Sequence, residues 1–497
     1  MLPLSVFSVN LLSGNLLLLS ALLIMAAVLI SRVGAKLGAP AMLLFLLLGM
    51  AAGQDGLGIH FQDYSLAESM GHFAMSVILF CGGMETSLKE TRPVMKQGLL
   101  LSTVGLLLMV LITGGLIWLV ARGAIGSLAA TLMGCILIAA TISSTDSTAV
   151  FSVLRDKRLR LRENLGPLLE VESGSNDPVA YVLTILLVKM LPIAQEAGGM
   201  SMGLVGKGLG LLLLQLAVGL AVGLAVGYAG AWLLGRINLP ASSLYAILTL
   251  SIGFLSNALA TLLFGNGLLA IYVTAIVIGN HRALPYKKDC IRFFAGITWL
   301  MQLAMFLMLG LLAKPSEMAR VAAPACLVAL MMILVARPLC TFLCLAPFRS
   351  LSFKAKAMVS WVGLKGAGPI LFALCPVVAG MDGATHIFNI VFCITLISLV
   401  VQGMTLTPVA KWLGLSYEQD PEAETFGLDL PEEMGMLRDH VVAAGEMGNG
   451  KTLRELHLPH GIRVVMVQRE GRFLVPHGSM KLQEGDHLII VMGESDD

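Results

Sequence analysis

Long apolar runs constrain this chain more than any other feature of its sequence. Runs close to the ~20 residues that a helix needs to cross a bilayer recur along most of residues 1–413. Because no water reaches the hydrocarbon to satisfy backbone groups, such runs must form helices or a closed barrel. Their continuous Leu, Ala, Gly and Met content indicates helices, since barrel strands alternate in polarity over ~10 residues. Only 13% of the residues are charged, against ~25% in soluble domains, which excludes an ordinary cytosolic enzyme.

The sequence predicts thirteen transmembrane helices: 10–31, 39–54, 66–84, 98–121, 127–154, 164–190, 206–234, 242–260, 264–280, 293–313, 321–346, 356–379 and 385–413. The loops that this assignment places on one side hold 19 Lys and Arg, and the alternate loops hold 5. Cytoplasmic loops carry the excess of basic residues, so we expect an outside N-terminus and a cytoplasmic C-terminus. No cleavable signal peptide is expected, because the first basic residue is Arg32. A multi-pass membrane protein is predicted, with lipid around it.

Polar residues and helix breakers interrupt two of these spans. The first interruption is Ser143-Ser-Thr-Asp146-Ser-Thr148, and the second is Gly363-Leu-Lys-Gly-Ala-Gly-Pro369. If the seventh span is a linker, the others form two six-helix halves, and each interruption falls in the fifth helix of its half. Paired broken helices at corresponding positions indicate a transport site at the interface of two inverted repeats. We therefore expect an all-α membrane domain with crossed broken helices.

The last part of the chain differs in charge and pattern. From Tyr417 onward, 16 acidic residues accompany 7 basic ones, whereas up to Ser416, 15 acidic residues accompany 26 basic ones. This shift predicts a membrane domain over 1–413, a linker over 414–431 and a cytoplasmic domain over 432–497, and it disfavours nucleic-acid binding by the tail. Short apolar runs separated by turn residues predict a small α/β fold. The strands are expected at 441–444, 463–468, 472–475 and 487–491, with one short helix over 452–457.

Two patterns are interpreted as carrying no chemistry. The segment Gly445-Glu-Met-Gly-Asn-Gly-Lys-Thr452 fits a phosphate-binding loop. Fewer than fifty residues follow it, and Pro459 ends the helix, which leaves no room for a parallel sheet. The eight cysteines lie in the apolar part, and Cys340 and Cys344 lack further ligands at metal-site spacing. No cofactor and no resident metal is expected.

Six ionisable residues are predicted inside spans: Asp146, Glu170, Glu172, Asp177, Arg337 and Lys365. Such residues are costly in a membrane, and their default interpretation is functional. Glu172 and Asp177 lie five positions apart on one helix, a net rotation of about 140°, so they point in different directions. We expect one of them to face the ion path.

Asp177 is the candidate for that role. Desolvation disfavours the charged form of a carboxylate, so a partly dehydrated Asp177 can hold either a proton or a small cation near neutral pH. Its neighbour Asn176 adds an amide in place of a second charge, which predicts one-for-one, electroneutral exchange. The alternative is that Asp177 caps or pairs within the helix bundle.

The other ionisable residues divide between the site and its support. An unwound Thr145-Asp146 segment would point carbonyl oxygens at a cation, although Asp146 fits local capping as well. Glu172 is predicted to form a structural salt bridge with Arg337, and Lys365 to compensate the negative helix ends and carboxylates near its broken helix. Glu170 is placed at the interior rim with little functional weight.

Four motifs in these spans resemble the monovalent cation:proton antiporter-1 family, and within it the potassium/proton branch of NhaP type. They are Ser144-Thr-Asp-Ser-Thr148, Glu172-Ser-Gly-Ser-Asn-Asp-Pro178, Val335-Ala-Arg-Pro338 and Gly363-Leu-Lys-Gly-Ala-Gly-Pro369. The resemblance covers about residues 10–413. It implies a homodimer in which a core of spans 4–6 and 11–13 moves like an elevator. It also implies that Asp177 takes the ion or proton and that Ser173 joins the Thr145-Asp146 region in the site.

Three positions depart from the family pattern. The usual Thr-Asp-Pro is Thr145-Asp146-Ser147, the usual Gly-Leu-Arg-Gly contains Lys365, and an often acidic position is Cys81. The tail resembles the TrkA-C (RCK-C) subdomain of potassium-conductance regulators, through Gly450-Lys-Thr-Leu-Arg-Glu-Leu456, Arg463–Arg469 and Leu482–Asp486. This second resemblance implies a regulatory module that binds a small molecule, and it favours potassium over sodium by association.

We therefore expect a secondary K⁺/H⁺ antiporter regulated by its tail. Na⁺/H⁺ exchange is the alternative, and a tail-gated cation channel a further one. The chain lacks a Thr-Val-Gly-Tyr-Gly filter, and paired broken helices suit alternating access better. A membrane-embedded enzyme is disfavoured, because the sequence shows neither a nucleophile–base pair nor metal-ligand spacing.

Overall fold

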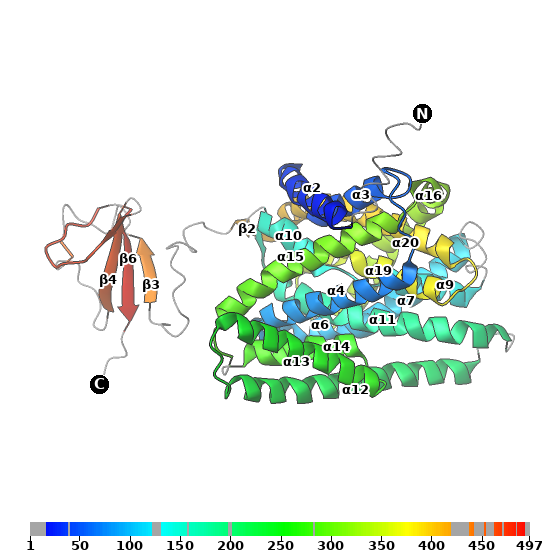
Figure 1. Ribbon diagram of the computed structural model, residues 1–497, viewed down its shortest axis with the longest axis horizontal. Coiled ribbons are helices and arrows are strands. Elements are labelled where there is room, and N and C mark those ends of the chain that lie inside the picture. The colour runs from blue at the N-terminus through cyan, green and yellow to red at the C-terminus, as the bar shows by residue number, and fades with distance from the viewer. Residues whose placement is uncertain are drawn as a thin grey trace. The chain divides into compact units, whose positions relative to one another are not determined.

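The computed structural model describes residues 16–37, 40–121, 131–156, 159–196, 201–281, 284–418, 437–441, 452–453, 462–469, 472–483 and 485–492. The chain divides into two compact units, Met1–Glu418 and Gln419–Asp497, and each is described by itself. The first is helical and the second is built around a β-sheet (Figure 1).

The first half of the helical unit consists of α2 (Leu16–Leu37), α3 (Ala41–Ala52), α4 (Tyr64–Glu85), α5 (Leu88–Thr91), η1 (Arg92–Val94), α6 (Met95–Leu100), η2 (Leu101–Gly105), α7 (Leu106–Leu116), η3 (Ile117–Ala121), α9 (Leu132–Thr141), α10 (Ser147–Asp156), β1 (Leu159–Leu161) and α11 (Leu165–Glu196). The second half consists of α12 (Met202–Leu234), α13 (Ser242–Leu262), α14 (Gly267–Asn280), α15 (Lys287–Leu312), α16 (Pro315–Met331), η5 (Met332–Ala336), α17 (Arg337–Leu345), α18 (Phe353–Trp361), α19 (Ala367–Val378), α20 (Ala384–Leu413) and β2 (Ser416–Glu418). The segments α5 to η3 form one continuous helical stretch, as do α16 to α17.

Several of these helices are long and apolar enough to cross a membrane. In the described part of the chain there are eight, and five further apolar helices are shorter. The prediction of a mostly helical, multi-pass membrane unit is confirmed. Thirteen spans and two inverted repeats stay predictions.

Small residues let neighbouring helices approach closely. A Cβ atom added to Gly219, Gly223 or Gly227 of α12 would lie 2.6, 2.8 or 2.9 Å from atoms of Asn266, Ala270 or Val277. The hydroxyl of Thr274 donates to the carbonyl of Gly223 across this contact at 3.0 Å. Such spacing is typical of membrane helices, which associate by packing rather than by excluding water. The contact fixes α14 firmly against α12.

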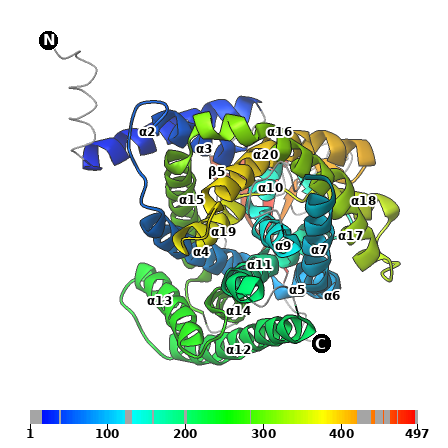
Figure 2. The same cartoon turned by 90° about the vertical axis from the view of Figure 1, so that its right-hand side faces the viewer.

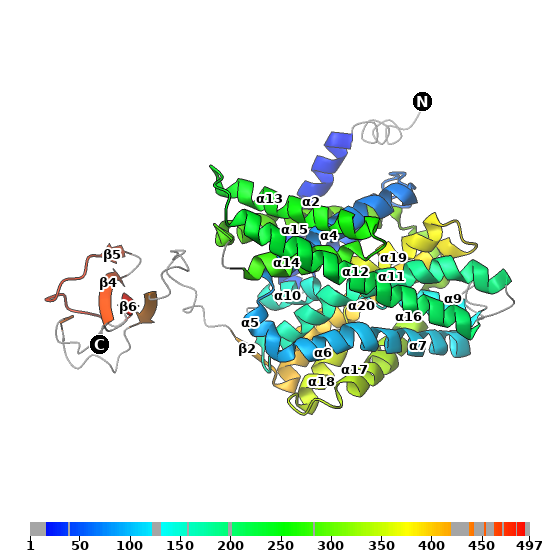
Figure 3. The ribbon, with the colours of Figure 1, turned by 90° about the horizontal axis from the view of Figure 1, so that it is seen from below.

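Parts of the interrupted helices lie between the outer helices of the bundle. The end-on view shows α12 and α13 along one edge and α17 and α18 along another, with α9, α11 and α19 between them (Figure 2). Both interruptions fall at the polar segments that the sequence singled out: residues 142–146 separate α9 from α10, and residues 362–366 separate α18 from α19. The view from below shows α11 running beside α12 (Figure 3).

The tail unit contains an antiparallel sheet in the order β3-β6-β4-β5. Its strands are β3 (Leu437–Val441), β4 (Ile462–Arg469), β5 (Arg472–Leu474) and β6 (His487–Met492). Val467, Leu482, Leu488 and Ile490 form its small core. Three expected strands coincide with β4, β5 and β6, whereas the first begins four residues earlier than expected, at Leu437 instead of 441. Most of the expected helix over 452–457, and residues 445–451 of the phosphate-loop pattern, lie outside the described residues.

Candidate ion-binding site

The two helix interruptions contact each other. The backbone N–H of Asp146 donates to the carbonyl of Leu364 at 2.8 Å. A Cβ atom on Gly366 would lie 2.0 Å from Oδ2 of Asp146, so only glycine permits this approach. Four helix ends therefore meet in one region, where their unpaired backbone groups need partners.

Lys365 supplies one set of partners. Its Nζ donates to the carbonyls of Ser143 and Ser144 at 3.0 and 2.9 Å, just beyond the end of α9. The Lys365 side chain is completely buried. A cation at the C-terminal end of a helix stabilises its free carbonyls. The structure thus places Lys365 at the C-terminal end of α9.

One face of α11 carries the residues nearest to this crossing. The Ser173 hydroxyl donates to the Thr145 carbonyl at 2.8 Å, and Nδ2 of Asn176 donates to the Thr145 hydroxyl at 2.5 Å. The Ser144 hydroxyl donates to Oδ1 of Asp177. The amide oxygen of Asn176 is buried and accepts no hydrogen bond among the described residues. The Asn176 amide and the Asp177 carboxylate of α11 are thereby held against the unwound segment between α9 and α10.

Asp146 has a different set of contacts. Its Oδ1 accepts from the backbone N–H groups of Thr148 and Ala149 at 2.9 and 3.2 Å, and from the Thr148 hydroxyl. These bonds cap the N-terminus of α10. Asp146 also lines the cavity described below. It therefore caps α10 and at the same time lies beside the expected ion path.

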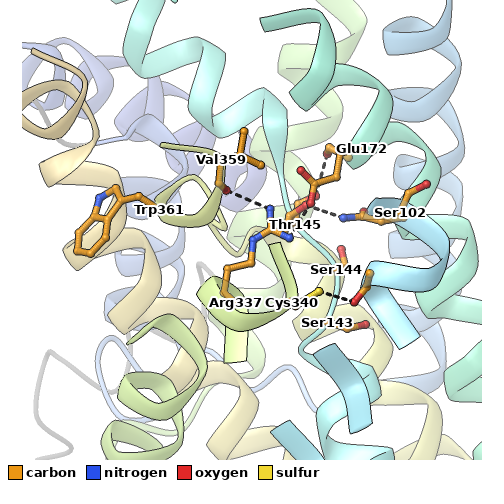
Figure 4. A network of polar contacts seen from close by, with 12 residues as sticks. Ser102, Ser143, Ser144, Thr145, Glu172, Arg337, Cys340, Val359 and Trp361 are labelled. Atoms are coloured by element: carbon orange, nitrogen blue, oxygen red, sulfur yellow. Dashed lines mark hydrogen bonds and ion pairs between the residues drawn. The ribbon is translucent and has the colours of Figure 1, made fainter. Parts of the chain in front are cut away.

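Glu172 points away from Asp177, toward α17. Its Oε1 lies 2.6 Å from Nη1 of Arg337, and the two side chains are 2% and 5% exposed. Nη2 of Arg337 also donates to the Val359 carbonyl of α18 at 3.4 Å. The close-up shows the carboxylate and guanidinium facing each other, with Cys340 one turn further along α17 (Figure 4). The pair connects α11, α17 and α18.

A cavity of about 130 Å³ ends at Asp177. Ser144, Asp146, Ser173 and Asp177 line it, whereas Thr145 and Asn176 do not. Its remaining wall consists of Met75, Ile78, Leu79, Gly82, Glu85, Thr86, Thr148, Phe151, Glu170, Gly174, Tyr272, Gln302, Met305, Phe306, Ala367 and Gly368. The exposed side chain of Glu85 indicates that the cavity opens near the end of α4. Such a volume has room for several waters or a partly hydrated cation, because one water needs about 10–15 Å³ of cavity space.

Aromatic rings close the opposite side of Asp177. Tyr181 lies one helical turn beyond Asp177 on α11, and its ring is 4.2 Å from His72 and 5.7 Å from Phe372. No residue of α11 after Asp177, and none of α4 before Met75, lines the cavity. Asp177 is thus reached from one side, with packed aromatic rings on the other.

Helix α14 contacts α11 beside the site. The ring of Tyr272 lies over Gly174, where an added Cβ would meet it at 2.4 Å. Nδ2 of Asn266 donates to the carbonyl of Pro178 at 2.8 Å. These two specific contacts set the position of α11 along α14.

The sequence interpretation missed several residues. Ser144 lies in one of the four motifs, and the run of hydroxyl residues around it could have indicated a contact with a carboxylate such as Asp177. Tyr272 and Gln302 gave no such signal, because their presence depends on which helices pack together. Cys81 is buried away from the cavity, and α4 brings Glu85, one turn later, to the wall. Among the described residues no group of three metal-ligating side chains occurs.

Both parts of the chain are similar to known proteins. Residues 19–412 match the family described as sodium/hydrogen exchanger, transmembrane, and residues 437–496 match the TrkA-C domain. The K(+)/H(+) antiporter NhaP2 of Shewanella sp. (strain ANA-3) is 36% identical over 488 residues, which cover 96% of this chain and 81% of that protein. The K(+)/H(+) antiporter NhaP of Alkalimonas amylolytica is 33% identical over 493 residues, with the same two coverages of 96% and 81%.

More distant similarities extend to sodium antiporters. The Na(+)/H(+) antiporter NhaH of Halobacillus aidingensis is 29% identical over 300 residues, which cover 56% of this chain and 68% of that protein. The solved structure of the sodium proton antiporter MjNhaP1 from Methanocaldococcus jannaschii matches with a TM-score of 0.67 and 22% identity. It covers 82% of this chain and 99% of its own. This last likeness concerns the fold.

Proposed function

Because the chain belongs to the sodium/hydrogen exchanger family, we propose that it exchanges one K⁺ for one H⁺ at Asp177, without net charge movement. Membership of this family makes it a cation/proton antiporter rather than an enzyme, in agreement with the sequence prediction. Potassium is favoured over sodium because relatives that match 96% of the chain are named K(+)/H(+) antiporters. Sodium remains the alternative.

The observation that carries this proposal is the position of Asp177 at the end of the cavity. Its carboxylate accepts from Ser144 and lies on the same face of α11 as Ser173. Carboxylate and hydroxyl oxygens are hard ligands that suit a monovalent cation as well as a proton. Thr145 and Asn176 complete the site from behind the cavity wall. The Thr145 carbonyl accepts a hydrogen bond from Ser173, and Asn176 donates one to the Thr145 hydroxyl. Asp146 fixes the unwound segment by capping α10.

Alternating access requires the site to close on one side while it opens on the other. The cavity leads to Asp177 from the Glu85 side, and the rings of Tyr181 and His72 close the other. We propose that a core of spans 4–6 and 11–13 moves like an elevator past the remaining helices. The moving interface would include α11 against α14, so the packing of Tyr272 on Gly174 and the hydrogen bond from Asn266 to Pro178 would break and re-form during the motion.

Glu172, Arg337 and Lys365 support the site without binding the ion. The Glu172–Arg337 pair lies on the side of α11 that faces away from the cavity. Lys365 stabilises the end of α9. Loss of any of these charges would leave a partner unpaired in a region of low dielectric.

The remaining architecture is proposed on sequence grounds. It comprises thirteen spans over residues 1–413 with two inverted repeats, a linker over 414–431, and a cytoplasmic TrkA-C-like domain over 432–497 that regulates exchange. A homodimer in a bacterial inner membrane is proposed, with the N-terminus outside. A small molecule bound by the tail is the proposed regulator.

Exchange in proteoliposomes tests the function directly. With a pH gradient across the vesicle, wild-type protein is expected to move K⁺ in a saturable way, and Asp177→Asn is expected to abolish this flux. Glu170→Gln is the matched control: it neutralises a carboxylate on the same helix and cavity wall, and we expect exchange to continue. Normal exchange by Asp177→Asn would contradict a mechanism in which Asp177 binds the ion and the proton. Flux of K⁺ without proton coupling would instead indicate a channel, and preference for Na⁺ would correct the substrate.

A further inference from the structure

The segment that leads to the tail begins as a strand on the transport unit. β2, which directly follows α20, pairs antiparallel with β1 in the register Leu159–Glu418, Arg160–Tyr417 and Leu161–Ser416. The N–H of Arg162 donates to the carbonyl of Leu415 at 2.8 Å and extends the ladder. Leu159 and Leu415 are buried, 6% and 4% exposed. We call these two strands the ribbon.

The ribbon lies on the connection between the two helices that hold the site. β1 follows α10, whose first turn is capped by Asp146, and precedes α11, which carries Asp177. From Leu165 to Asp177 is twelve residues of helix, a length of about 18 Å at 1.5 Å per residue. Only residues 162–164 lie between β1 and this helix, so an unbroken helix connects the ribbon to Asp177.

The same connection also holds the second broken helix. Glu163 accepts hydrogen bonds from the backbone N–H and the hydroxyl of Ser352, at 3.1 and 2.9 Å. Ser352 in turn caps α18 by accepting from the N–H of Ala355. α18 leads within nine residues to the interruption that contains Lys365. One loop thus touches α10, α11, α18 and the linker strand.

The backbone of this loop is held in an uncommon conformation. Glu163 and Asn164 have φ of +58° and +54°, in the left-handed region that non-glycine residues seldom adopt. Two such residues in succession persist only where surrounding contacts determine the backbone. The ribbon on one side and Ser352 on the other are those contacts.

We propose that the ribbon and Glu163 form the mechanical connection through which the tail controls the ion site. This inference rests on the proposed antiport function and specifies how it is regulated. A change in the tail acts on β2, because the chain runs from Glu418 into the second unit. β2 shifts β1 and, with it, the ends of α10, α11 and α18, which alters how Asp177 alternates between its two exposures.

Exchange rates of full-length and shortened chains in proteoliposomes test this connection, and four chains form the central comparison. They are wild type, a chain ending at Glu418, Tyr417→Pro, and the shortened chain with Tyr417→Pro. Hydrogen-bonded and non-hydrogen-bonded pairs alternate along an antiparallel ladder, so Arg160–Tyr417 is the bonded pair next to Arg162–Leu415. Proline at 417 removes that donor, whereas Ser416→Pro changes an N–H that points away from β1 and is the matched control. Tyr417→Ala controls for loss of the ring.

Removal of the tail is expected to change the initial rate of K⁺/H⁺ exchange about fivefold or more, the lower range of allosteric coupling. Tyr417→Pro should change the rate in the same direction, and shortening this variant should add nothing. Ser416→Pro and Tyr417→Ala should keep the response to shortening. Glu163→Gly, which tolerates the left-handed backbone but loses both bonds to Ser352, should reduce the response without touching the ribbon.

Two results would overturn the connection. One is an undiminished effect of shortening in both Tyr417→Pro and Glu163→Gly, and the other is no effect of shortening in wild type. Size-exclusion profiles establish that each variant is folded, and Glu163→Gly decides the question if Tyr417→Pro is not. If the wild-type protein exchanges only Na⁺, the same variants are compared by their rates of Na⁺/H⁺ exchange. Absence of any exchange by wild type contradicts the proposed function itself, a result separate from both.

Discussion

Removing one member of the Glu172–Arg337 pair should destabilise the protein more than removing both. Glu172→Gln leaves a guanidinium in a site where the two side chains are only 2% and 5% exposed. Its other contact, to the Val359 carbonyl, is 3.4 Å long and offers little compensation. An unpaired buried charge costs about 3–5 kcal/mol, whereas replacing both charges by well-packed apolar residues of similar volume is often close to neutral.

A double-mutant cycle measures this difference. We expect Glu172→Gln and Arg337→Gln each to lower the free energy of unfolding by about 3–5 kcal/mol, and the double variant to lower it by less than either single variant does. Unfolding in detergent by increasing denaturant, followed by fluorescence of the 5 tryptophans, supplies the free energies. Losses that simply add in the double variant would refute the interaction. A stable Glu172→Gln protein with a changed ion preference would refute its structural role.

Two further predictions concern the helix crossing and the tail. Gly366→Ala should lower exchange about tenfold and stability by about 1–3 kcal/mol, because its Cβ would lie 2.0 Å from Asp146 Oδ2, whereas Gly115→Ala meets no atom within 4 Å and should change neither. In the tail, burial alone would raise the pKa of Asp486, but hydrogen bonds from Arg469 hold the pKa below its usual value. Its stabilising effect is present above the unfolded pKa of about 3.9 and lost as pH falls through the folded value. Limited proteolysis of the full chain should therefore show the tail opening below about pH 4, and Asp486→Asn should open at neutral pH; equal protection of both proteins at pH 7 would contradict this.

The sequence singled out residues that the structure brings close together, but it did not predict their contacts. Helical phase separates Glu172 from Asp177, because both lie on the regular helix α11, where rotation per residue is fixed. No such regularity exists in the unwound segment 142–146. The contact of Ser144 with Asp177, and the capping role of the Asp146 carboxylate, follow from how two broken helices cross, which only the three-dimensional structure shows.

Features that join distant parts of the chain were beyond the sequence patterns. Tyr272 faces Gly174 because α14 packs on both α11 and α12, and no periodicity within α14 identifies that partner. The ribbon is a similar case. β1 and β2 are each three residues long, too short for a recognisable alternation, and they are far apart in the sequence. Their pairing depends on the arrangement of α10 and α20 around them.

The charges near the crossing argue for exchange without net charge movement. With Asp146, Glu172 and Asp177 ionised and Lys365 and Arg337 protonated, the five side chains sum to one negative charge, and one proton or one monovalent cation neutralises it. Both loaded states then cross the low-dielectric region with equal charge, so their relative energies do not depend on membrane potential. The initial rate of exchange in proteoliposomes is expected to stay constant when a potential of either sign is imposed. For comparison, one uncompensated charge would gain or lose about 2.3 kcal/mol per 100 mV, enough to change the rate many-fold. A rate that follows the potential would therefore show that a second proton or cation takes part, with Asp146 as the group to neutralise next.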